Sequence, residues 1–182
     1  MKIGYLASSN RDKSTLVNTA IARYGWQLSP VSPGNAESDL PIGYEVAAIG
    51  KAIAGAKSVE SSIPVFGLDS GYEFDCFGGW PGPLTARSLK QHKLHTVSIP
   101  LGSQVTVVQS LAIVWEGRCS VSTHRDRRVV NTHQTQEGST LPLTTLAVGP
   151  KEALSQCVAD LMKWMEQIKH IQAVADAASK ED

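Results

Sequence analysis

The chain opens with the stretch that decides its fold class, Met1-Lys2-Ile3-Gly4-Tyr5-Leu6-Ala7-Ser8-Ser9-Asn10-Arg11-Asp12-Lys13. The apolar run that ends at Ala7 is typical of a buried strand, and the polar residues after it indicate a loop. Helical spacing then begins, with apolar residues at Leu16, Val17, Ala20, Ile21 and Tyr24. Gly25 stands where helices commonly end. The opening therefore predicts a strand, a polar loop and a helix.

The same alternation continues outward from this opening. The expected strands are 26–31, 64–68, 105–115 and 119–130, and the expected helices lie at 46–56 and after Pro150. The last two strands surround Glu116-Gly117, which is typical of a hairpin. Because strands and helices alternate before the hairpin, we expect an α/β fold with a mixed sheet flanked by helices.

Length and charge narrow the class of protein. The chain of 182 residues suits a single domain over 1–182, with an alanine-rich tail at 173–182 that frays. Lys plus Arg and Asp plus Glu both number 17, so the broad basic field of a nucleic-acid-binding protein is missing. No apolar run has the length of a signal peptide or a membrane span. We therefore expect a cytosolic protein with no nucleic-acid or membrane partner, which holds phosphate through a few local groups.

The loop Ser8-Ser9-Asn10, followed by Lys13, is the first candidate site. A strand that enters a helix through small polar residues presents unpaired backbone amides at the positive end of the helix, where phosphate binds well. Lys13 adds a positive charge. The same residues also form an ordinary helix cap, and spacing alone leaves both interpretations open.

Asp69, after the strand at 64–68, is the second candidate. Ligands of open α/β sheets collect at the carboxyl ends of strands, and a carboxylate there holds magnesium or orients a water molecule. The small Ser70-Gly71 leaves room for a ligand. The alternative is an aspartate that bonds its own turn.

A third group consists of Glu37 and Asp39 in an irregular segment and Lys51 in the expected helix. One of these acids facing Asp69 would complete a magnesium site, whereas a solvated loop and a surface lysine are the alternative.

The basic run His124-Arg125-Asp126-Arg127-Arg128 is interpreted as a solvated strand face.

Taken together and in order, these motifs resemble the inosine/xanthosine triphosphate pyrophosphatase (ITPase-like) family. The family's small-polar-Asn-x-x-Lys loop corresponds to residues 8–13, and its helical Lys-Ala segment to Lys51-Ala52. The most specific stretch is Asp69-Ser70-Gly71, then Gly78-Gly79-Trp80-Pro81-Gly82, then Thr85-Ala86-Arg87. The resemblance covers about residues 2–90 of the sequence.

The resemblance implies an elongated fold with a central cleft, a homodimer, and Mg²⁺-dependent cleavage of a nucleoside triphosphate into monophosphate and pyrophosphate. The implied catalytic residues are Asp69 and Lys13, and the implied metal ligands are Asp69 with Asp39 or Glu37, Asp39 being preferred. The implied substrate contacts are Ser8, Ser9, Asn10, Lys13, Lys51, Ser70, Gly71 and Arg87.

The second half departs from the family. Residues 130–141 lack its Phe-Gly-x-Asp-Pro segment, Ser155-Gln156-Cys157 replaces its Ser-His-Arg motif, and Leu68 replaces its acid before Asp69. The first two of these missing motifs are the ones that the resemblance implies for reading the base, so base preference does not carry over. The alternatives are a catalytically silent nucleotide-binding or interaction protein on the same fold, and a related pyrophosphatase that acts on modified pyrimidine or other nucleotides.

Overall fold

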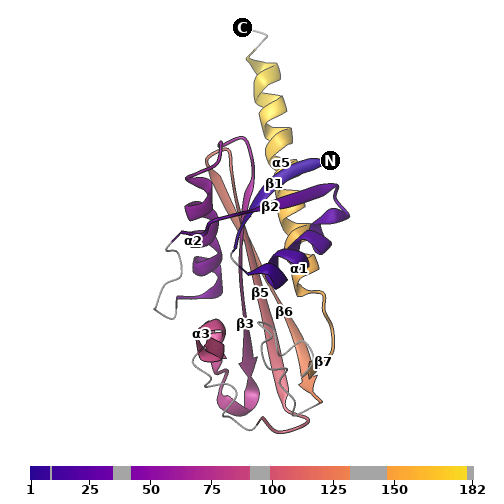
Figure 1. Cartoon of the computed structure of the whole chain (residues 1–182). Helices are drawn as coiled ribbons and strands as arrows, with labels where there is room; N and C mark the ends of the chain where they lie inside the picture. Colours follow the sequence, from indigo (N-terminus) through magenta and orange to yellow (C-terminus); the bar gives the residue numbers. More distant parts are fainter. Residues whose placement is uncertain (9, 35–41, 91–98, 132–146, 180–182) are drawn as a thin grey trace.

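The computed structural model describes residues 1–8, 10–34, 42–90, 99–131 and 147–179 (Figure 1). In this part of the chain, seven strands form one sheet in the order β2-β1-β3-β5-β6-β7, with β4 paired to β3. The strands are β1 (Lys2–Ala7), β2 (Trp26–Val31), β3 (Val65–Phe74), β4 (Pro81–Gly82), β5 (Gln104–Trp115), β6 (Arg118–Val130) and β7 (Ala147–Val148). The helices are α1 (Arg11–Ala22), α2 (Tyr44–Ala56), α3 (Thr85–Lys90) and α5 (Ala153–Ala178), with a short 3-10 turn at Asp75–Phe77.

The sheet is mixed, as predicted. β1 runs parallel to β2 and β3, whereas β5 pairs antiparallel to both β3 and β6, and β7 pairs antiparallel to β6. β3, β5 and β6 are long, and they extend well beyond the end of α2 (Figure 1). The molecule is elongated for this reason.

Helices cover both faces of the sheet. On one face, α1 and α5 pack on a core cluster that contains Val17, Leu161, Phe66 and Leu68. On the other face, α2 packs on the sheet through Ala48, Ala52 and the β5 residue Ala112. Successive strand residues point to opposite faces. Leu68 therefore faces α1 and α5, whereas Asp69 faces α2.

Small residues let α2 approach the sheet closely. A Cβ at Gly67 would lie 2.3 Å from the Ala48 carbonyl oxygen, and a Cβ at Gly71 would lie 2.8 Å from Cε1 of Tyr44. Glycine is required at both positions because a larger residue would overlap α2. The helix is thereby held directly over residues 67–71 of β3.

The predicted elements are present, with two informative shifts. β3 does not stop before Asp69, because β5 pairs with every residue from Val65 to Phe74. Asp69 consequently lies in the middle of a strand and not at its end, and the interpretation of Asp69 as a turn residue is wrong. Helix α5 begins at Ala153, after Pro150, and continues to Ala178.

The basic run of β6 is only half solvated. Arg125 and Arg127 are exposed, but Asp126 and Arg128 are buried on the α5 side, where an Arg128 guanidinium nitrogen lies 3.2 Å from an Asp126 oxygen. Asp126 also accepts hydrogen bonds from the backbone amides of Glu152 and Ala153. β6 therefore caps the beginning of α5 through Asp126.

Within the described ranges, no helix has the length and apolar character needed to cross a membrane.

Candidate active site

An ion pair between α2 and β3 forms the centre of the candidate site. The Lys51 Nζ atom lies 2.7 Å from Oδ1 of Asp69, and both side chains are 12% exposed. Lys51 Nζ also donates to the Leu68 carbonyl oxygen, at 3.4 Å. The fold therefore brings together two of the candidate site residues, Lys51 and Asp69.

This pair lies beside an interruption in the sheet. On one edge of β3, the pairing with β1 ends at Gly67 and the pairing with β4 begins at Tyr72. Between these two points, no described strand pairs with that edge of residues 68–71. Open α/β sheets bind their substrates at crevices of this kind.

The β1–α1 loop lies next to this interruption, because β1 ends where Ala7 pairs with Gly67. The Asn10 side chain accepts a hydrogen bond from the Lys13 amide at 3.1 Å, and Ser8 Oγ accepts one from the Asn10 amide at 3.2 Å. Both side chains thus cap α1, and the positive end of its helix dipole faces this region. Lys13 stands in the first turn of α1 and is partly buried.

Tyr44 is a residue of this site that the sequence motifs did not indicate. It is the first residue of α2, is 4% exposed, and covers Gly71. Its hydroxyl is buried and makes no hydrogen bond. Burial raises the pKa of the Tyr44 phenol far above its usual range, and the charges of Glu73 and Asp69 raise it further. The phenol therefore remains a neutral donor.

The remaining predicted residues divide into three groups. Ser70 follows Asp69 in β3, so its side chain is on the opposite face, toward α1 and α5. Arg87 lies in α3, directly after β4, and is partly buried. Ser9, Glu37 and Asp39 lie outside the described residues.

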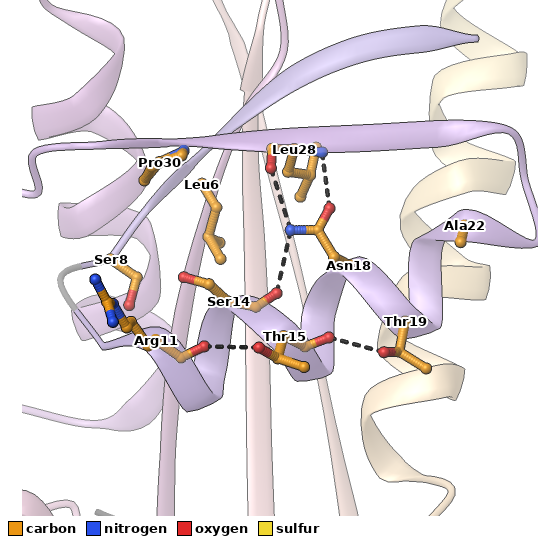
Figure 2. Close-up of a pocket in the computed structure, with 10 residues that line it drawn as sticks. All are labelled: Leu6, Ser8, Arg11, Ser14, Thr15, Asn18, Thr19, Ala22, Leu28 and Pro30. Atoms are coloured by element: carbon orange, nitrogen blue, oxygen red, sulfur yellow. Dashed lines mark hydrogen bonds between the residues drawn. The ribbon is translucent and has the colours of Figure 1, made fainter.

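A groove of about 800 Å³ lies between α1 and the edge strand β2 (Figure 2). Its polar groups are mostly bonded within the protein: the Asn18 amide bonds both backbone groups of Leu28, and Thr15 and Thr19 donate to carbonyls of their own helix. Ser8 is the one predicted site residue, apart from those outside the described ranges, that lines it. The groove therefore belongs to the α1 face and not to the Lys51–Asp69 pair.

The donor chemistry fits magnesium. In the described part of the chain, no three His, Cys, Asp or Glu side chains gather as a metal site. Magnesium, however, commonly takes only one or two protein carboxylates, and substrate phosphates and water complete its shell. Asp69, whose second carboxylate oxygen is not engaged by Lys51, meets this need.

Comparison with known proteins identifies the class of fold. No family model matches the sequence, and no curated protein matches it. Solved structures do match, and nucleoside-triphosphatase and HAM1 structures are among them. The predicted ITPase-like fold is thereby confirmed.

Three of these structures illustrate the likeness. The nucleoside-triphosphatase (dITP/XTP pyrophosphatase) of Mycobacterium abscessus is 19% identical, with a TM-score of 0.52 over 96% of this chain and 97% of its own. The HAM1 protein of Coxiella burnetii is 13% identical, with a TM-score of 0.57 over 92% and 99%. The Ham1 protein of Staphylococcus aureus is 15% identical, with a TM-score of 0.55 over 92% and 100%. At these identities the likeness establishes the fold.

Proposed function

We propose that this protein hydrolyses a nucleoside triphosphate to the monophosphate and pyrophosphate. The observation that carries the proposal is the Lys51–Asp69 pair beside an unpaired edge of β3, next to the amino end of α1. The fold shared with nucleoside-triphosphatase structures supports it.

The position of each residue indicates its role in the proposed reaction. The amino end of α1 and Lys13 bind the phosphates, and Lys51 and Arg87 neutralise their charge. Asp69 orients a water molecule and accepts its proton as the water oxygen attacks the α-phosphorus. The bond between the α-phosphorus and the bridging oxygen then breaks, and pyrophosphate leaves.

Mg²⁺ is part of this proposal. Asp69, with Asp39 or Glu37 as second acid, would hold it, and the bound ion would supply charge neutralisation for the triphosphate. A homodimer and a cytosolic location follow from the resemblance in sequence and complete the proposal.

A substrate panel tests the function. Standard and deaminated nucleoside triphosphates are incubated with and without Mg²⁺, and pyrophosphate is measured. We expect metal-dependent release from at least one nucleotide. Release from none of them, with modified pyrimidine nucleotides included, would exclude the enzyme.

One observation favours a second candidate, a nucleotide-binding protein without catalysis. Leu68 stands where the resembling family has an acid, and its side chain is 1% exposed inside the main core cluster. This position supplies no metal ligand. Equilibrium binding of a triphosphate without turnover distinguishes this candidate from the enzyme.

A further inference from the structure

Three polar side chains form a row across the sheet face that α1 and α5 cover. Ser70 of β3 pairs with Gln109 of β5, which in turn pairs with His124 of β6. Each of the three is partly exposed. Because residues in register on neighbouring strands share a face, their side chains lie side by side, and the row spans about 10 Å.

The row separates two apolar clusters. On one side, Leu68 and Leu111 belong to the core under α1 and α5, and both are buried. On the other side, Tyr72 and Val107 belong to a second buried cluster. On β3 and β5, the row is therefore polar and partly exposed between positions that are apolar and buried. The row is a polar part of the sheet face that solvent reaches.

The side-chain oxygen of Gln109 has no hydrogen-bond partner. This atom, Oε1, is buried. The strand at this point is fixed, because the Cys157 thiol of α5 donates to the Gln109 backbone carbonyl at 3.3 Å. A buried acceptor without a partner destabilises the fold, so a donor supplied by a ligand would remove a penalty.

His124 is held in one orientation. Its Nε2 lies 2.7 Å from an Asp160 carboxylate oxygen, and that oxygen also accepts a hydrogen bond from Ser122 Oγ at 2.6 Å. The row thus presents one acceptor without a partner, Gln109 Oε1, together with the oriented His124 ring and the hydroxyl of Ser70.

We propose that the row of Ser70, Gln109 and His124 is the base-binding subsite, and that Gln109 determines base specificity. The ligand is a nucleobase whose edge presents an N–H donor to Gln109 Oε1. This inference rests on the proposed function. Asp69 and Ser70 are on opposite faces of β3, so the nucleotide would cross the edge of residues 68–71, where no described strand pairs, to reach from one to the other. A planar base edge also suits the planar amide of Gln109, because the two can form paired hydrogen bonds.

Gln109→Met tests the proposal, with Gln104→Met as its matched control. The two glutamines lie in the same strand, but Gln104 is exposed at the beginning of β5, outside the row. The readouts are kcat/KM for each nucleotide of the panel, the inhibition constant of inorganic tripolyphosphate, and the melting temperature.

We expect Gln109→Met to lower kcat/KM for the preferred nucleotide by about tenfold or more, the effect of one lost buried hydrogen bond. It should flatten the preference among bases, leave tripolyphosphate inhibition unchanged and not lower the melting temperature. Gln104→Met should match the wild type. An unchanged base preference, or an equal loss of tripolyphosphate binding, would overturn the assignment.

A wild-type protein that hydrolyses no nucleotide would refute the proposed function alone. Binding of nucleosides without phosphates, followed by NMR shifts, then decides the inference about the base. Binding that Gln109→Met abolishes and Gln104→Met retains supports the subsite. No binding of any nucleoside to the wild type overturns it.

Discussion

Lys51 Nζ and Asp69 Oδ1 lie 2.7 Å apart and join the middle of α2 to the middle of β3. The pair exists because glycines at 67 and 71 let the helix rest directly on the strand on both sides of Asp69. A carboxylate held in this way has a fixed position, and Oδ1 is the oxygen that Lys51 contacts. Fixed geometry of this kind is what phosphoryl transfer requires.

Replacing Asp69 with Asn should abolish pyrophosphate release while the protein stays folded. The amide still accepts a hydrogen bond from Lys51 but cannot accept a proton from water, so we expect a loss of about 100-fold or more. Release is measured with the best nucleotide of the panel, and the fold is checked by circular dichroism. An active Asp69→Asn enzyme would remove Asp69 from the mechanism.

Gly67→Ala should both destabilise the protein and lower its activity. The added Cβ would lie 2.3 Å from the Ala48 carbonyl oxygen, a backbone atom that cannot move aside alone. We expect a loss of about 2 kcal/mol or more in the free energy of unfolding, as for other overpacked sites. Urea denaturation measures it.

Gly50→Ala is the matched control for this variant. Gly50 lies within α2, and a Cβ there would meet nothing within 4 Å. Alanine favours a helix over glycine by up to about 1 kcal/mol, so this change should stabilise the protein. Equal effects of the two variants would contradict the close contact between α2 and β3.

Asp126→Ala should be strongly destabilising. The carboxylate, 6% exposed like its partner Arg128, also accepts the amides that begin α5. Removing one member of a buried ion pair leaves the other charge unpaired, at a cost of about 3–5 kcal/mol. Asp75→Ala is the control, because the Asp75–Arg127 pair is exposed and its loss should change stability by less than about 1 kcal/mol. Chemical denaturation of both variants compares them.

The order of elements could be predicted because periodicity reports local structure. The alternation of Leu16, Val17, Ala20 and Ile21 with polar residues is a helix pattern in any context. The end of β3 could not be predicted in this way. Its length is set by pairing with β5, more than thirty residues later. Ser70-Gly71 is a local turn signal, but the hydrogen bonds to β5 keep these residues in the strand.

The site was only partly visible in the sequence for a related reason. Motif order marked both Lys51 and Asp69 as candidate site residues, and the structure joins them in an ion pair. Tyr44 and Gln109 belong to no motif. Their significance arises from buried polar atoms without partners, a property that depends on what the fold brings around them. Glu37 and Asp39 lie outside the described residues, so their role stays a prediction.

Alkaline pH should unfold the protein through its buried tyrosines. Burial raises the pKa of Tyr72 to about 12 and that of Tyr44 further, above the ordinary value of 10.0. The unfolded chain therefore loses these protons first, and the free energy of unfolding should fall as pH rises from about 10 to about 12. Below that window the contribution is fully present. Tyrosinate absorbance and circular dichroism followed together measure it.

Tyr44→Phe and Tyr72→Phe assign this effect to the two phenols. Each variant removes one group that must stay neutral in the fold, so each should reduce the decline in stability with pH. Tyr44→Phe should also raise stability at neutral pH, because it removes a buried hydroxyl that has no hydrogen-bond partner. Tyr5→Phe, at a partly exposed position of β1, should leave the decline unchanged. Titration of all the tyrosines near pH 10 with the fold intact would show that neither phenol is buried as described.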